Sequence, residues 1–220
     1  MIVAHSFDWY AISRQEIINY MQLITHKIVD CDISQDVVYK LICNHLKCEY
    51  PIAFKKYRSL LPNPIHVSGK YYPSQDRLNQ RPIQIGLHFN KLVTNIQVDH
   101  PTFIQISKLI ADTVLHEILH LYQYRTRKFK SLANRKKYVS GKLYGHRQHY
   151  YGQLDEIDAY SFNIACEMLD DSILAENCNS YQLYLTNFNQ DLQHPALVLL
   201  NTKIKSYLPH ALIGKPVNHP

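Results

Sequence analysis

Residues 114–123 have the sequence VLHEILHLYQ, and residues 116–120 within them form the pattern His-Glu-Ile-Leu-His. Two histidines four residues apart on a helix point from one face, so the His116 and His120 imidazoles can converge on one ion. Glu117 is rotated by about a third of a turn and can reach a metal-bound water without ligating the metal. The preceding run, residues 103–112, has no Gly or Pro, and Pro101-Thr102 predicts a helix start with Thr102 as its cap.

A second predicted helix, residues 153–165, carries three acids at its start: Asp155, Glu156 and Asp158. Zinc in a hydrolytic site takes three protein ligands and keeps one position open for water. The two histidines supply two of these ligands, so the third has to come from elsewhere in the chain. A carboxylate on a following helix is a suitable source, and Glu156 lies 36 residues after His120.

Over residues 104–169 the chain resembles the HExxH zinc metallopeptidases of the gluzincin type, in which a following acidic helix supplies the third ligand. The resemblance implies a zincin-like α+β fold, mainly helical, with a small mixed sheet and an active-site HExxH helix. It implies that Zn2+ is held by His116, His120 and Glu156, with Asp158 as first reserve ligand and Asp155 as second. It also implies that Glu117 is the general base.

Some residues of the chain differ from those of better-known HExxH peptidases, and these differences limit which branch of the group the chain resembles. Gln123 and Thr126 stand where a metzincin continues with Gly and a third His, which excludes that branch. Tyr160 stands four residues after Glu156, where thermolysin-like enzymes carry an acid that orients a histidine. The Tyr160 hydroxyl could orient a histidine in the same way, and packing in a half-buried position explains this tyrosine equally well. The Glu-x-Asp-Ala-Tyr form at residues 156–160 is similar to small, often phage-encoded HExxH proteins.

The whole chain has the composition of an ordinary globular protein. Its 220 residues, 46% of them hydrophobic, suit a single domain. We expect an N-terminal helical part (1–50), a catalytic core (51–170) and a C-terminal helical part (171–220). No apolar run is long enough to span a membrane, and residues 1–9 lack the features of a secretory signal. Five dispersed cysteines without a Cys-x-x-Cys pair favour reduced thiols and a cytoplasmic location, including the cytoplasm of a phage host.

Flanking elements follow from local patterns. Ser13 and Glu16 have capping-box spacing and predict a helix over 13–29, and Ser34 begins another over 34–48.

Prolines and polar residues predict loop over 51–82, with short strands near His66 and Tyr71. Residues 83–89 alternate as a half-buried strand, for which we hypothesise an edge position that pairs with extended substrate; an interior position fits equally well. Helical patterns recur over 181–192 and 195–207, and residues 214–220 are predicted to form a tail.

The segment between the two predicted metal helices is strongly basic. Residues 125–147 contain nine Lys and Arg residues and no acid. Such a segment suits contact with nucleic acid or an acidic partner. A solvated connection that balances acids elsewhere is favoured over it, because the aromatic and motif signals of a nucleic-acid-binding module are missing. His146, His149, Tyr150 and Tyr151 follow, and one of them could donate a hydrogen bond to a developing oxyanion.

The leading hypothesis is a zinc-dependent peptidase that acts on a protein or peptide substrate. One alternative is a zinc-containing nucleic-acid- or protein-binding module of HExxH ancestry. An intact Glu117 argues against that alternative, since a purely structural zinc site needs no base beside the metal. A further alternative is a protease that acts on DNA-bound proteins, as SprT-like proteases do, although their common zinc ribbon is not visible in this sequence.

Overall fold

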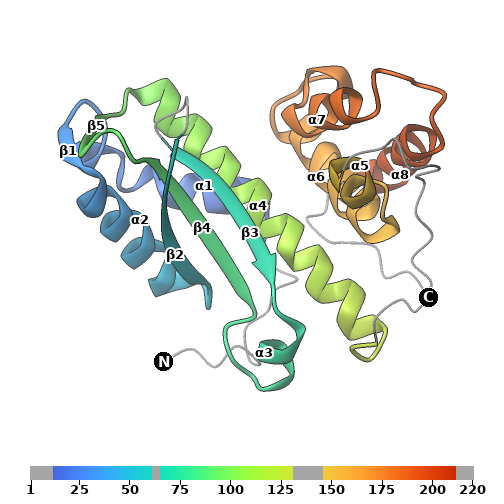
Figure 1. Ribbon diagram of the computed structural model, residues 1–220, viewed down its shortest axis with the longest axis horizontal. Helices are drawn as coiled ribbons and strands as arrows, with labels where there is room; N and C mark the ends of the chain where they lie inside the picture. The colour runs from blue at the N-terminus through green and yellow to red at the C-terminus, as the bar shows by residue number, and fades with distance from the viewer. Residues whose placement is uncertain (1–11, 61–64, 131–145, 212–220) are drawn as a thin grey trace. The chain divides into compact units, whose positions relative to one another are not determined.

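The computed structural model describes residues 12–60, 65–130 and 146–211. They form an α+β protein with small mixed sheets, as the sequence predicts (Figure 1). The chain divides after Leu121 into two compact units. The predicted division at residues 50 and 170 within one domain stays a prediction.

The first unit begins with two capped helices, α1 (Arg14–Gln22) and α2 (Gln35–Glu49). The Ser13 hydroxyl accepts a hydrogen bond from the Glu16 amide, and the Ser34 hydroxyl accepts one from the Val37 amide. Both predicted starts are therefore confirmed. α1 ends earlier than the predicted residue 29, because the amides of Leu23 and Ile24 donate to carbonyls only three residues back. A short 3-10 turn, η2 (Thr25–Lys27), follows.

Two small sheets complete this unit. β1 (Asp32–Ser34) pairs antiparallel with β5 (Asn95–Gln97). A three-stranded sheet has the order β2-β4-β3, with β2 parallel and β3 antiparallel to β4. Its strands and the helix that links β3 to β4 are β2 (Ala53–Ser59), β3 (Ile65–Tyr71), α3 (Pro73–Arg77) and β4 (Ile83–Asn90).

The structure overturns one prediction about this sheet and decides between the two positions left open for residues 83–89. Residues 53–59 form a full strand where the sequence predicts loop. The alternation of apolar and polar residues is not evident in this stretch because Lys56, a charged residue, faces the core side. Its ammonium lies over the Phe89 ring, 5.0 Å from the centroid. The strand over 83–90 is present, but it is the middle strand and not an edge. Both of its sides are paired within the sheet, so it has no free edge to offer to a substrate.

The core of the first unit lies between this sheet and its helices, which cover one face of the sheet (Figure 1). Alternate residues of β4 point into it and are fully buried: Ile83, Ile85, Leu87 and Phe89. α4 (His100–Thr126) contributes the buried Phe103, Ile110 and Val114. This helix starts at His100, and the Asp99 carboxylate accepts from the Thr102 amide at 2.9 Å. Asp99, rather than the predicted Thr102, therefore caps it.

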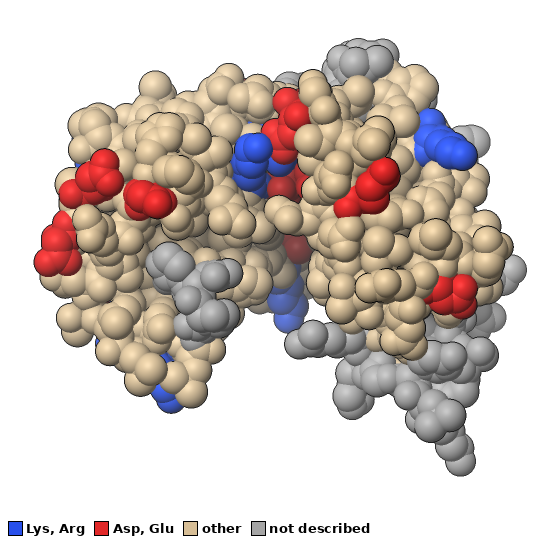
Figure 2. Space-filling view, turned by 90° about the horizontal axis from the view of Figure 1, so that it is seen from above, with Lys and Arg blue, Asp and Glu red and all other residues tan. Residues whose placement is uncertain are grey.

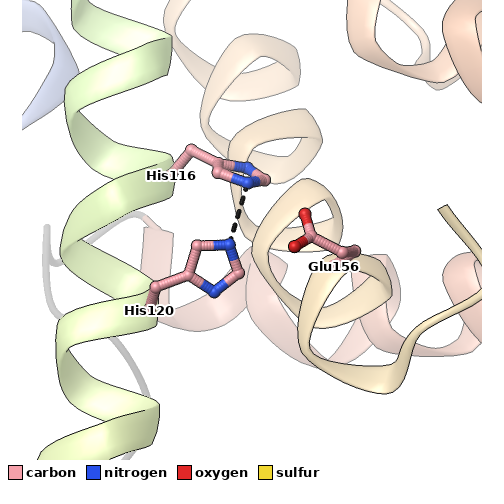
Figure 3. Close-up of side chains that lie close together, drawn as sticks. All are labelled: His116, His120 and Glu156. Carbon is pink, nitrogen blue, oxygen red and sulfur yellow. Dashed lines mark hydrogen bonds between the residues drawn. The ribbon is translucent and has the colours of Figure 1, made fainter. Parts of the chain in front are cut away.

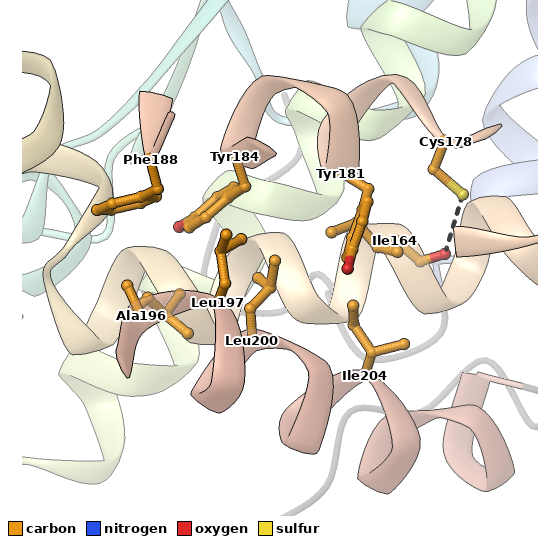
Figure 4. Close-up of a cluster of buried hydrophobic side chains, with 10 residues drawn as sticks. Ile164, Cys178, Tyr181, Tyr184, Phe188, Ala196, Leu197, Leu200 and Ile204 are labelled. Atoms are coloured by element: carbon orange, nitrogen blue, oxygen red, sulfur yellow. Dashed lines mark hydrogen bonds between the residues drawn. The ribbon is translucent and has the colours of Figure 1, made fainter. Parts of the chain in front are cut away.

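The second unit is helical in the residues that the structure describes. Its elements are α5 (His146–Tyr151), α6 (Leu154–Asp170), η3 (Ala175–Asn177), α7 (Asn179–Asn187) and α8 (Pro195–Ala211). Figure 4 shows apolar side chains from α6, α7 and α8 that meet in one buried cluster around Tyr184, Leu197 and Leu200. α7 ends at residue 187, short of the predicted 192, where Asn189 and Gln190 turn the chain with positive φ angles.

Within the described ranges, no helix combines the length and the hydropathy needed to cross a bilayer. All five cysteines are free thiols. The basic segment falls largely on residues 131–145, and the predicted tail on 214–220; both lie outside the described residues.

Candidate metal centre

The two histidines of the HExxH motif lie on one face of α4, as their spacing predicts. Their Nε2 atoms are 3.1 Å apart, and the two rings meet edge to face with centroids separated by 4.7 Å. His116 is buried and His120 is half-buried. The nitrogen lone pairs of this pair can therefore be directed at one point beside the helix.

Glu117, the predicted base, is also buried, with only 6% of its surface exposed. Its neighbour is β3, whose Gly69 has no side chain at the point of contact. A Cβ atom at position 69 would lie 2.5 Å from the Glu117 Oε1 atom and 2.6 Å from the Thr113 Cγ2 atom. Gly69 itself is exposed, so the Glu117 carboxylate lies against an open stretch of an edge strand.

Sequence reasoning missed the role of Gly69. Its only signal is a glycine within a strand, which often marks the close approach of another group. Residues 65–71 contain such a glycine, but the sequence does not indicate which side chain approaches it.

Glu156 lies in the first turn of α6 and is buried. Its carboxylate and the two imidazoles supply ligand atoms that all lie within 4.8 Å of one another. Figure 3 shows the three side chains pointing toward one another. The structure thus brings His116, His120 and Glu156 together closely enough to hold a metal ion. Among the described residues it is the one such group of three or more His, Cys, Asp or Glu side chains.

The two reserve ligands are engaged elsewhere. Asp155 receives two parallel hydrogen bonds from the Arg127 guanidinium, at 2.8 and 3.0 Å. Asp158 accepts from Lys203 and Tyr207 of α8, and from Gln123 of α4 at 3.2 Å. Both carboxylates are therefore tied into ion pairs and hydrogen bonds, and Glu156 is the acid of the three that joins the histidines.

The same contacts hold the start of α6 against the end of α4. Gln123 also donates to the Asp155 backbone carbonyl at 3.0 Å, and it lies one helical turn after His120. Arg127 follows one turn later. Gln123 near the end of α4 and Arg127 just after it therefore hold Asp155 and Asp158 in the first turn of α6, which also contains Glu156.

The predicted oxyanion donors have different surroundings. The Tyr151 ring packs edge to face on Tyr160 and Tyr184, at centroid distances of 5.6 and 5.4 Å. Tyr160 also contacts Tyr184, which supports packing as the role of its ring. Burial, followed by the charge of Glu156, holds the pKa of the Tyr184 phenol well above its usual value. Tyr150 is exposed and His149 is half-buried, while the side chain of His146 lies outside the described residues.

Zinc fits the donor set of this centre. Two imidazole nitrogens and one carboxylate form a ligand set found in hydrolytic zinc sites. Tetrahedral zinc with Zn–N distances of about 2.0–2.1 Å separates two nitrogen ligands by about 3.3 Å. The observed separation of 3.1 Å between the two Nε2 atoms is close to that value.

Comparison of the chain with protein-family models, with curated proteins and with solved structures finds no match. The features of the chain that point to a function are therefore the geometry and chemistry of residues 116, 117, 120 and 156.

Proposed function

We propose that the chain is a zinc-dependent metallopeptidase with a zincin-like fold. The observation that carries this proposal is the group of His116, His120 and Glu156, whose ligand atoms lie within 4.8 Å of one another. The buried carboxylate of Glu117 on the same helix supports it, since a purely structural metal site has no use for a neighbouring base.

In this proposal His116, His120 and Glu156 hold the ion. Zinc bound there supplies a Lewis acid that polarises a carbonyl group and lowers the pKa of a water molecule toward neutrality. Glu117 accepts the proton of the attacking water and then delivers it to the leaving amine nitrogen. Its contact with Gly69 holds the carboxylate against the inner face of β3, an edge strand of the sheet.

β3 is the strand that we propose to align the substrate, in place of the strand first predicted. It is an edge strand of the β2-β4-β3 sheet, and its Gly69 lies directly against the base. An extended peptide that pairs with such an edge satisfies main-chain donors and acceptors while it contacts few side chains. This arrangement suits a peptidase with broad sequence preference.

Glu117→Gln tests this function. The amide cannot accept the proton, so we expect casein cleavage to fall by at least about 100-fold while bound zinc stays at the wild-type level. Fluorescently labelled casein gives the rate, and elemental analysis gives the zinc content. Glu176→Gln, which removes an exposed acid far along the sequence, is the matched control and should cleave at the wild-type rate. Wild-type cleavage by Glu117→Gln would show that Glu117 is not the base.

A further inference from the structure

The face of the three-stranded sheet that points away from α4 carries a second group of polar side chains. Strand residues alternate between the two faces. The odd-numbered residues of β4 are buried in the core, so its even-numbered residues lie on the opposite, outer face. Register places the following residues beside them on that face: Lys55 and Tyr57 from β2, and His66, Ser68 and Lys70 from β3.

Positive charge and the lack of acids distinguish this outer face. None of the residues of β2, β3 and β4 is Asp or Glu. Lys55 and Lys70 are exposed; their ammonium groups lie over the rings of Tyr57 and Tyr72, and neither has an acidic partner among the described residues. By contrast, Lys56 on the inner side forms an ion pair with Asp36.

Acids of the first unit lie elsewhere. Figure 2 shows acidic side chains (red) on the left of this unit, at the end where β1 and β5 pair. Asp30 and Asp32 are exposed there. The outer face of the sheet thus keeps a positive surface, and Asp30 and Asp32 lie at another end of the unit.

Rings stack at the centre of the outer face. Tyr57 stacks on His88 with centroids 4.5 Å apart, and His66 lies 5.5 Å from His88 on the other side. The Ser68 hydroxyl and His88 Nε2 share a hydrogen bond of 2.8 Å, which holds the ring in place. Gly86 makes room for this arrangement, because a Cβ atom there would lie 2.6 Å from the Ser68 Oγ atom.

His88 adds a flat neutral ring to this surface at neutral pH. Burial, with a smaller contribution from His66, lowers the pKa of His88 below its usual value. An uncharged imidazole stacks well on other rings, while the neighbouring lysines supply the charge. The outer face therefore combines stacking rings with flanking cations.

We propose that this outer face binds single-stranded nucleic acid. Proteins that bind single strands without sequence preference combine lysines or arginines for the phosphates with exposed rings for the bases. Lys55 and Lys70 would contact the backbone, and the Tyr57, His66 and His88 rings would meet the bases. An acidic polypeptide would use the lysines alone and leave the rings without a role.

The experiment measures binding of a fluorescein-labelled 15-nucleotide oligo(dT) to the full chain by anisotropy. Lys55→Ala/Lys70→Ala is compared with Lys27→Ala/Lys205→Ala, which removes two exposed lysines elsewhere. We expect the first pair to raise Kd about tenfold and to reduce the slope of log K against log salt by about 1.4, since each lost phosphate contact contributes about 0.7. The control pair should stay within about twofold of wild type.

A second pair of variants tests the rings. Tyr57→Leu should weaken binding about tenfold, whereas Tyr57→Phe, which keeps the ring, should bind as wild type does. The proposal is overturned if wild type does not bind the oligonucleotide, or if both lysine pairs weaken binding equally. It is also overturned if Tyr57→Leu binds as wild type does, or if polyglutamate displaces the oligonucleotide as well as unlabelled oligo(dT) does, because the face then selects charge alone.

Discussion

Gly69 and Glu117 illustrate how one missing side chain can position a reactive group. The Glu117 Oε1 atom occupies space that any Cβ atom at position 69 would fill. A larger residue at 69 would turn this flexible carboxylate away and would also press on the Thr113 Cγ2 atom, 2.6 Å from the Cβ position. The proposed base would then move, at some cost in the free energy of unfolding.

Gly69→Ala is therefore expected to lower kcat by about tenfold or more and to leave zinc content unchanged, because a displacement of about 1 Å at a catalytic group can cost about 100-fold in rate. Steady-state cleavage of a fluorogenic peptide gives kcat and KM, and elemental analysis gives zinc. Lys27→Ala, which removes an exposed lysine away from both proposed sites, is the control and should keep the wild-type kcat. An unchanged kcat in Gly69→Ala would show that the contact does not position Glu117.

The ligand residues could be predicted from sequence to different extents. The convergence of His116 and His120 can be predicted from the helical repeat alone, because that repeat is a local property of the sequence. The 3.1 Å separation of their Nε2 atoms confirms it. Glu156 could not be separated from Asp155 and Asp158 by spacing alone. The choice depends on Arg127, Lys203 and Tyr207, which engage the other two carboxylates and whose positions are set by tertiary packing.

At the scale of elements, the Arg127–Asp155 pair joins the end of α4 to the start of α6. Its two hydrogen bonds are parallel, and both side chains are mostly buried. Arg127→Ala should lower the free energy of unfolding by about 2 kcal/mol, because the mostly buried Asp155 carboxylate loses its charged hydrogen-bond partner. It should also weaken zinc binding, since Asp155 adjoins Glu156.

Urea denaturation measures the first effect and zinc titration with a chromophoric competitor the second. Arg127→Lys keeps the charge but not the paired geometry, and we expect an intermediate loss of stability. If Arg127→Ala unfolds at the wild-type urea concentration and binds zinc equally well, the pair does not anchor α6.

Helices were easier to predict than strand order. α2 follows from periodicity and its Ser34 cap, and α4 and α6 follow from the periodicity of residues that lie close together in the sequence. The position of residues 83–90 in the middle of the sheet depends on pairing with residues 53–59 and 65–71, which local alternation does not report. The edge strands are therefore β2 and β3, and the substrate role is proposed for β3, which contacts Glu117.

At the scale of the whole molecule, a bound ion should stabilise the folded chain. A ligand present at about 1,000 times its Kd adds about 4 kcal/mol to the free energy of unfolding. For a chain of this length that corresponds to a rise in Tm of about 10 °C. EDTA should therefore lower Tm in differential scanning fluorimetry by that amount, and added zinc should restore it.

His120→Ala, which lacks one proposed ligand, is the control for this measurement: EDTA should leave its Tm unchanged. An equal shift in wild type and His120→Ala would place the effect of EDTA at another site.

The zinc content of wild type and Glu156→Ala, measured by elemental analysis after dialysis, tests the proposed ligand set most directly. We predict one zinc per wild-type chain, less than a tenth of that in Glu156→Ala, and wild-type content in the exposed-acid control Glu176→Ala. A Glu156→Ala protein that retains one zinc per chain would contradict the assignment of Glu156 as third ligand.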